Sequence, residues 1–209
     1  MYKYFLLFAL AASLSGFKRP SNDEHTKVVQ AANEKLSSFL ANIPAGSEGQ
    51  FGLTNRDEIK IATLGNPYHV LVMSKEFYDA QSLTTINNTG YITESNEWRV
   101  PVKVKGDSRL LMTVNVNDGK YTAGDIGGAG LAHELQQMTG KPKSKHTYYI
   151  LRIYSLTSDF LVDAPGGSLA DARFIPLASA RMAMPALTMN KAGYSLTETL
   201  NAIKEKLNK

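Results

Sequence analysis

The most promising residues for ligand chemistry lie in the glycine-rich turn Gly127-Gly128-Ala129-Gly130, between a predicted strand and a predicted helix. Backbone N–H groups at the start of a helix can bind phosphate or carboxylate, and glycines let a ligand approach closely. The dinucleotide-binding fingerprint is not met, because His133 stands where glycine or alanine is required. Two interpretations follow: a ligand site formed by Gly127, Gly128, Gly130 and His133, or a tight connection where the helix crosses the sheet.

The His133-Glu134 pair invites comparison with a zinc protease. That chemistry needs a second histidine one helical turn later to share the metal, and position 137 is glutamine. The other histidines, His25, His69 and His146, are dispersed along the chain without ligand spacing. We therefore expect no metal site and no cofactor.

Nucleophilic and paired-acid chemistry lack a complete set of residues. The segment 167–170 does not supply the Gly-x-Ser-x-Gly of a hydrolase elbow, and a chain without cysteine excludes a thiol mechanism. Paired carboxylates could hydrolyse glycosides, but the acids at 107 and 118 are turn residues. The remaining candidates are Glu94, Glu97 and Asp125.

Aromatic side chains are a further clue, since Tyr148, Tyr149 and Tyr154 fall on one predicted strand. Aromatic rings on a sheet can stack sugars or grip peptides, and they are also ordinary core residues. We favour core packing.

Helices are predicted at both ends of the chain. Ser21 and Glu24 have the spacing of a capping box, as do Ser195 and Glu198, and each pair precedes apolar residues at helical spacing. A third helix is predicted over 131–138.

The centre of the chain predicts a meander of strands over 98–105, 110–116 and 120–126. Asn117-Asp118-Gly119 predicts a tight hairpin turn, since Asp-Gly accepts positive φ. Pro101 lacks an N–H, so we expect its strand at an edge or Pro101 at a bulge. Further strands are predicted over 58–63, 68–73, 147–154, 160–162 and 173–182.

These elements predict an α+β fold. We expect one domain with a largely antiparallel sheet of about six to eight strands, and amphipathic helices at the N-terminus, middle and C-terminus packed on one face.

The first 16 residues are typical of a secretory signal peptide. Lys3 precedes the apolar run Tyr4–Ala12, and small residues follow at Ser13 and Ser15. The run is about half of the roughly 20 residues that cross a bilayer. We expect residues 1–16 to be removed, leaving an exported bacterial-type domain, 17–209, in the periplasm or outside the cell. Without cysteine it has no disulfides.

The formal net charge of +4 comes from scattered residues, whereas nucleic-acid-binding proteins cluster their basic side chains. We expect no nucleic-acid partner. The densest basic segment, 141–145, is interpreted as a solvated connector, with contact to anionic lipid or cell-wall polymer as the alternative.

Because no reaction's full residue set is present, the sequence favours a non-catalytic module that binds a small ligand, a peptide or a protein partner. The alternative is a secreted or periplasmic hydrolase whose active site is assembled only by the fold. A third class would recruit a partner along an exposed sheet edge.

Overall fold

The computed structural model describes residues 20–83, 88–140, 145–188 and 192–209. The expected signal peptide, 1–16, lies outside these ranges. The helices and strands of the described residues are α1 Asn22–Ala41, η1 Glu48–Phe51, η2 Arg56–Ile61, β1 Thr63–Leu64, β2 Tyr68–Met73, α2 Lys75–Asp79, η3 Asn88–Tyr91, β3 Ile92–Val104, β4 Asp107–Asn117, β5 Lys120–Gly127, α3 Ala129–Thr139, β6 His146–Ile153, η4 Tyr154–Leu156, β7 Ser158–Pro165, β8 Arg173–Pro176, α4 Ala178–Ala183 and α5 Leu196–Leu207.

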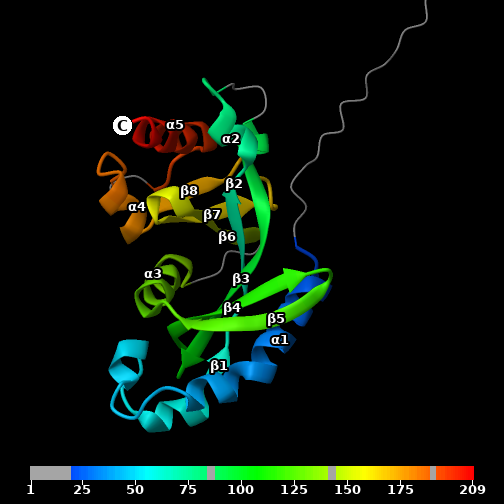
Figure 1. The fold of residues 1–209 in the computed structure, drawn as a ribbon, viewed down its shortest axis with the longest axis vertical. Coiled ribbons are helices and arrows are strands. Elements are labelled where there is room, and N and C mark those ends of the chain that lie inside the picture. The colour runs from blue at the N-terminus through cyan, green and yellow to red at the C-terminus, as the bar shows by residue number, and fades with distance from the viewer. Residues whose placement is uncertain (1–19, 84–87, 141–144, 189–191) are drawn as a thin grey trace, which may run out of the picture.

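Across the described ranges, eight strands form one sheet in the order β5-β4-β3-β2-β6-β7-β8, with the short β1 also paired to β3. Every pairing is antiparallel except that of β2 with β6, which is parallel. The α+β class and the largely antiparallel sheet with helices at the N-terminus, middle and C-terminus are therefore confirmed (Figure 1).

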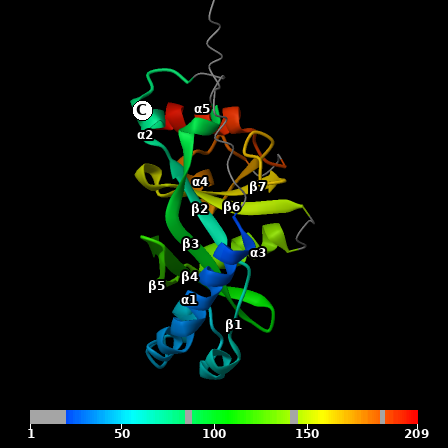
Figure 2. The same cartoon turned by 90° about the vertical axis from the view of Figure 1, so that its right-hand side faces the viewer.

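Helices cover both faces of this sheet, not one. Alternate side chains of β3 and β4 pack with α1, and those of β6 and β7 on the same face pack with α5. The opposite face, including Leu111, Ile150 and Leu161, packs against Ala132 and Leu135 of α3. Accordingly, α1 and α3 lie on opposite sides of β4 and β5 in Figure 1. The helices α1 and α5 lie toward opposite ends of the molecule (Figure 2).

Local sequence explains the ends of the two long helices. In both predicted capping boxes the serine hydroxyl accepts from the backbone N–H three residues on, and the glutamate accepts from the serine N–H. The boxes formed by Ser21 with Glu24 and by Ser195 with Glu198 are thus confirmed, and each satisfies N–H groups that have no partner within the helix.

Two tight turns set the register of the central meander. Asp118 and Gly119 have φ of 51° and 74°, and Lys105 and Gly106 have φ of 52° and 91°. Two consecutive residues with positive φ are typical of a type I′ turn, whose twist matches that of the strands it joins. The predicted hairpin turn at Asp118-Gly119 is confirmed.

Pro101 does not lie on an edge strand, because β3 is flanked by β4 on one side and by β1 and β2 on the other. The β1 pairing ends at Val102 and the β2 pairing begins at Arg99, so Pro101 faces the gap between them. Its carbonyl accepts from the Gly65 N–H at 2.7 Å. A bulge follows directly, between Val102 and Lys103. Because no strand of the described residues lies opposite Pro101 on that side, its missing N–H removes no hydrogen bond from the sheet.

Two predicted strands are wrong in part. Residues 56–61 form the helix η2, because the Asn55 side chain caps it and Glu58 accepts from the Thr54 N–H at 2.7 Å. The strand predicted over 173–182 ends at Pro176, and α4 follows. The Glu134 carboxylate on α3 accepts from the Ala178 N–H at 3.0 Å with both oxygens, so a distant residue caps this helix.

None of the helices in the described ranges is both long and apolar enough to cross a membrane.

Candidate functional site

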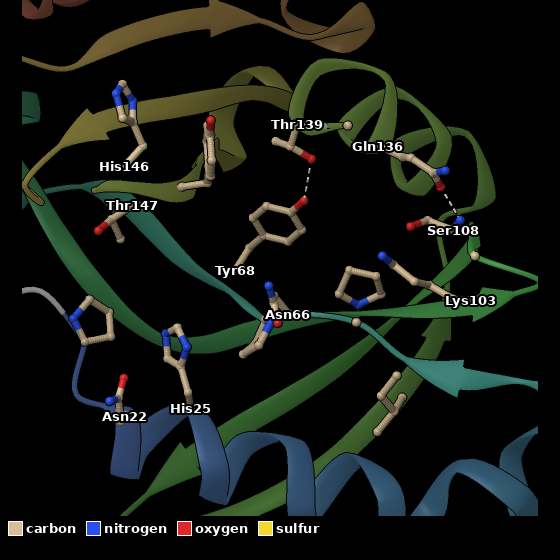
Figure 3. A pocket seen from close by; sticks show the side chains of 18 residues that line it. Asn22, His25, Asn66, Tyr68, Lys103, Ser108, Gln136, Thr139, His146 and Thr147 are labelled. Carbon is tan, nitrogen blue, oxygen red and sulfur yellow. Dashed lines mark hydrogen bonds between the residues drawn. The ribbon is translucent and has the colours of Figure 1, made fainter. Parts of the chain in front are cut away.

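A cavity of about 590 Å³ opens at the end of the sheet where β2 and β6 begin. This volume lies within the range of about 300–1,000 Å³ that is typical of small-molecule sites. Its walls are the connection from β1 to β2, the β3–β4 turn, the start of α1 and the end of α3 (Figure 3). Ten of its polar side chains are Asn22, His25, Asn66, Tyr68, Lys103, Ser108, Gln136, Thr139, His146 and Thr147.

The cavity exists because strand pairing is interrupted at this place. The chain leaves β1 at Leu64 and enters β2 at Tyr68, and the intervening 65–67 crosses in front of Pro101. A Cβ at Gly65 would lie 2.9 Å from Cε of Lys103 and 3.1 Å from Cβ of Pro101. A side chain at position 65 would therefore displace the end of the Lys103 side chain and press on Pro101.

Several polar groups of the wall already have partners within the protein. The Tyr68 hydroxyl lies 3.0 Å from Thr139 Oγ1, and Thr139 donates its own proton to the Leu135 carbonyl at 2.8 Å. Tyr68 is therefore the donor to Thr139, and burial raises its pKa. Gln136 accepts from the Ser108 N–H and donates to Asp107 at 3.3 Å. These bonds join β2 and the start of β4 to α3.

Other polar groups have no partner. Within the described residues, the side chains of Asn22, Asn66 and Lys103 form no hydrogen bond or ion pair. The Thr147 hydroxyl is buried without a partner. The hydroxyl of Ser108, a residue only 5 % exposed, likewise bonds to no described residue. Asn22 and Asn66 are exposed and can bond to bulk water, whereas the hydroxyls of Thr147 and Ser108 are groups that a ligand or water in the cavity can satisfy.

His146 is held by Asp163, whose carboxylate contacts its Nδ1. This contact orients the ring and leaves Nε2 for another partner. A hydrolytic triad would place a hydroxyl at Nε2, but among the described residues no serine or threonine bonds to it. The described residues thus include a histidine oriented by a carboxylate, but no serine or threonine bonded to that histidine as a nucleophile would be.

A histidine from α1 joins the cavity to the core. His25 lines the cavity and packs edge-on against Trp98, with ring centroids 5.3 Å apart. On its face, Trp98 stacks with His69, whose Nε2 lies 2.8 Å from the Ser95 carbonyl. Trp98 is the only tryptophan of the chain, so its emission reports on this wall.

The four residues predicted as a ligand site lie elsewhere, from the last residue of β5 into the N-terminal half of α3. Gly128 is the N-cap with φ of 67°, and a Cβ would meet only Leu111 Cδ1, at 3.8 Å. Gly127 and Gly130 have open space around them, which disfavours the tight-crossing interpretation. His133 contacts Gln137 through Nε2 at 2.8 Å. None of the four lines the cavity; a ligand role for them stays a prediction.

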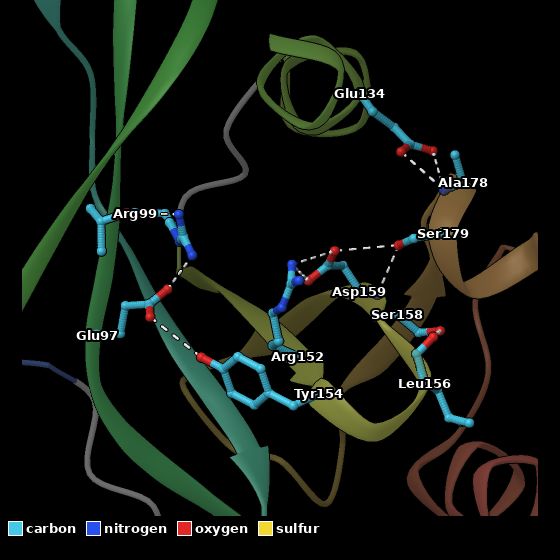
Figure 4. Close-up of polar contacts among 11 residues, drawn as sticks. Glu97, Arg99, Glu134, Arg152, Tyr154, Leu156, Ser158, Asp159, Ala178 and Ser179 are labelled. Atoms are coloured by element: carbon cyan, nitrogen blue, oxygen red, sulfur yellow. Dashed lines mark hydrogen bonds and ion pairs between the residues drawn. The ribbon is translucent and has the colours of Figure 1, made fainter. Parts of the chain in front are cut away.

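Gly130 instead borders a second cavity of about 470 Å³ between α3 and α4. Asp159 and Ser179 line it as well. Arg152 Nη1 donates to both oxygens of Asp159 at 3.0 Å, and the Ser179 hydroxyl lies 3.3 Å from the same carboxylate (Figure 4). Burial raises the pKa of Asp159, and Arg152 opposes that shift. Both oxygens of the Asp159 carboxylate already bond to Arg152, and one of them also contacts Ser179.

A neighbouring cluster is also balanced in charge. Arg99 pairs with Glu97 at 2.5 Å and donates to Thr113 at 2.7 Å, and the Tyr154 hydroxyl donates to Glu97 at 3.4 Å (Figure 4). Every charge here has an opposite neighbour. The cluster is typical of a structural network that joins β3 to β4 and to η4.

The three tyrosines of the β6 segment have three different environments. Tyr149 is fully buried in the core, Tyr148 lines the cavity and Tyr154 is 58 % exposed. Core packing is therefore confirmed for Tyr149, and Tyr148 also packs against the cluster under α3, whereas the exposed Tyr154 does not fit that prediction.

Residues 141–144 of the basic segment lie outside the described ranges, whereas Gly140 and His146 line the cavity. In the ranges that are described, no group of three or more histidine or acidic side chains is placed to hold a metal ion. Comparison with protein-family models, with curated proteins and with solved structures finds no match to this chain.

Proposed function

We propose that this chain is an exported, non-catalytic binding module that holds a small polar ligand in the cavity between α1, α3 and the β3–β4 turn. The observation that carries the proposal is the set of unpartnered polar groups in its wall: Asn66, Lys103, Ser108 and Thr147. Neighbouring side chains such as Tyr68 and Gln136 are fixed by internal bonds. In small-molecule sites a few precisely placed polar groups fix the orientation of the ligand and provide its specificity.

A ligand screen by thermal shift tests this proposal. The panel contains sugars, sugar acids, amino acids, short peptides and nucleotides. A ligand at about 100 times its dissociation constant stabilises the native state by roughly 2.7 kcal/mol, which raises the melting temperature by several degrees. Isothermal titration then gives the affinity of each hit.

Matched variants locate the site. Thr147→Val replaces a buried hydroxyl with a methyl group of similar volume, and we expect it to weaken binding of a hit. Gly128→Ala alters the turn before α3 and should leave the affinity unchanged. Loss of binding in Gly128→Ala with retention in Thr147→Val would place the ligand at the glycine turn and overturn the cavity proposal.

The hydrolase alternative is favoured by one observation, the His146–Asp163 pair. It predicts turnover of an ester, peptide or glycoside that is abolished in both His146→Gln and Asp163→Asn. The binding proposal expects no turnover in the wild-type protein. Substrate hydrolysis that both variants lose would establish the enzyme instead.

Export is proposed from the first 16 residues of the sequence. Expression of the full chain in a bacterial host should yield an extracytoplasmic protein that begins after Ser15 or Gly16. Leu7→Arg interrupts the apolar run and should keep the chain uncleaved in the cytoplasm. Amino-terminal sequencing of the two products checks this result, and an uncleaved wild-type chain would contradict it.

A further inference from the structure

The charges around the cavity are unequal. None of the 18 residues that line the cavity is an aspartate or a glutamate, whereas three of them are basic: Lys103, His25 and His146. Carboxylates beside the cavity have partners of their own: Asp163 contacts His146, and Asp107 accepts from Gln136 and lies 3.7 Å from Arg109. Glu24, next to the lining residue His25, accepts from the Ser21 backbone N–H at 2.7 Å. The wall therefore lacks an anion to match Lys103.

Lys103 and Ser108 are positioned together by the β3–β4 turn. They are direct cross-strand partners in the antiparallel ladder, so both side chains emerge on the same face of the hairpin. Lys103 is half-buried and unpaired, and its Cε lies beside Gly65 of the chain that passes in front. The aliphatic stem is thereby confined, and the ammonium group is held at this end of the cavity.

Ser108 adds a second donor. Its backbone N–H is used by Gln136, but its hydroxyl has no partner although the residue is 95 % removed from solvent. An ammonium and a hydroxyl side by side are a donor pair suited to the oxygens of a carboxylate or a phosphate. Lys103 has no carboxylate partner among the described residues, so an anion bound here would supply its counter-ion.

The other residues of the cavity wall favour a ligand whose uncharged part is also polar. Figure 3 shows Lys103 and Ser108 at one end and His146, Thr147 and His25 at the other, with Asn66 and the Tyr68 ring between them. A molecule that reaches from one end to the other would meet amide and hydroxyl groups along its length.

We propose that Lys103 Nζ and Ser108 Oγ bind the anionic group, a carboxylate or phosphate, of a small polar ligand whose remainder extends toward Asn66 and Thr147. This inference rests on the proposed binding function and names the chemical class of its ligand.

The test uses the full chain and a series of probes with one sugar body: glucose, glucuronate and glucose 6-phosphate. Acetate and inorganic phosphate are added as isolated anions, with chloride to match the ionic strength. Titration is followed by calorimetry and by emission of Trp98. We expect at least one anionic sugar to bind about tenfold more tightly than glucose, because charge-assisted hydrogen bonds are the stronger ones. Glucuronate and glucose 6-phosphate distinguish a carboxylate from a phosphate.

Four variants assign the effect. Lys103→Met keeps the length of the side chain and removes its charge, and Ser108→Ala removes the hydroxyl; both should abolish the preference for the anionic sugar. Lys103→Arg should restore most of it. Lys120→Met, at the exposed β4–β5 turn, removes an equal charge and should change nothing. Circular dichroism and melting temperature establish that each variant is folded.

The outcomes separate this inference from the proposed function. An anion preference that survives in Lys103→Met overturns the inference. Binding of glucose or another neutral ligand that depends on Thr147 but not on Lys103 overturns it too, while the binding function stands. If neither the anionic nor the neutral probes bind the wild-type protein, the binding function and the anion site are both wrong for this class of ligand.

Discussion

The imidazole of His69 lies flat on the indole of Trp98, with ring centroids 4.3 Å apart and ring planes within 3° of parallel. The two residues are cross-strand partners of β2 and β3, and Trp98 is only 3 % exposed. This stack occupies the place where the core under α1 meets the wall of the cavity. Trp98 also contacts His25, which lines the cavity, so we expect changes to this stack to affect the site as well as the fold.

Truncation at this stack should be severe. We expect Trp98→Ala to lower the free energy of unfolding by about 3–5 kcal/mol, since the loss of a buried aromatic side chain leaves a cavity. Urea unfolding followed by circular dichroism measures the change. Met182→Ala is the control, because Met182 is 78 % exposed and its loss should stay within about 0.5 kcal/mol. An equal effect of the two would contradict the packing described.

The β4–β5 turn makes a second prediction. Gly119 has φ of 74°, and a side chain there costs about 1–2 kcal/mol. Gly119→Ala should therefore destabilise the protein by that amount, as judged by urea unfolding. Gly49→Ala is the matched control, because Gly49 does not have positive φ and a Cβ there meets nothing within 4 Å. A loss of stability as large in the control would mean that backbone conformation is not the cause.

The capping box formed by Ser21 and Glu24 gives a third prediction. Ser21→Ala removes the hydroxyl that accepts from the Glu24 N–H at 3.1 Å, and should cost about 1 kcal/mol. Ser37→Ala, at an exposed position within the same helix where the side chain bonds to no described residue, should have no cost, because alanine is the better helix former. Thermal and chemical unfolding of the two variants provide the comparison.

The same box predicts a pH dependence. The Ser21 backbone N–H donates to the Glu24 carboxylate at 2.7 Å and lowers its pKa below the ordinary 4.5. A lowered pKa in the folded state gives stability that is present above 4.5 and lost as the pH falls through the folded value. Glu24→Gln should therefore lower the melting temperature at neutral pH, and the difference from wild type should shrink in acid. A difference independent of pH would show that charge has no part in the cap.

For Asp159 we expect the opposite dependence of stability on pH. Burial raises its pKa, so its contribution to stability is full below the ordinary value of 3.8 and declines as the pH rises through the folded value. Arg152 offsets this decline through its two 3.0 Å contacts. Arg152→Leu leaves a buried carboxylate unpaired and should destabilise the protein by roughly 3 kcal/mol at neutral pH.

In acid the effect of Arg152→Leu should become smaller, because the protonated Asp159 needs no counter-ion. Urea unfolding at neutral and acidic pH measures both values. The double variant Arg152→Leu with Asp159→Leu removes both charges and should recover much of the stability. If the double variant is no more stable than the single one, unpaired charge is not the cause.

Features that depend on neighbouring residues could be predicted from the sequence. The capping boxes of α1 and α5 and the Asp118-Gly119 turn need only residues within a few positions of one another. Alternation of apolar residues predicted the central strands for the same reason. Helix α4 could not be predicted, because its cap is Glu134 on another helix.

The candidate site could not be assembled from the sequence because it draws on separate segments. Lys103 and Ser108 come from one hairpin, Asn66 from an earlier connection and His146 from a strand that follows α3. The sequence held one signal: a Gly-Asn-Pro connection at 65–67 together with a proline at 101 indicates interrupted strand pairing. That signal identifies where a gap lies, and only the fold shows which side chains surround it.

The single parallel pairing in the sheet has a consequence for the order in which the chain can fold. Strands β3, β4 and β5 follow one another through two-residue turns, whereas β2 must wait for β6, which is far away in the sequence. Non-local contacts of this kind slow folding. Until β6 arrives, the Val70 and Leu71 stretch of β2 presents an open hydrogen-bonding edge. The C-terminal third of the chain thus protects the rest from self-association, and a chain that ends after α3 should aggregate.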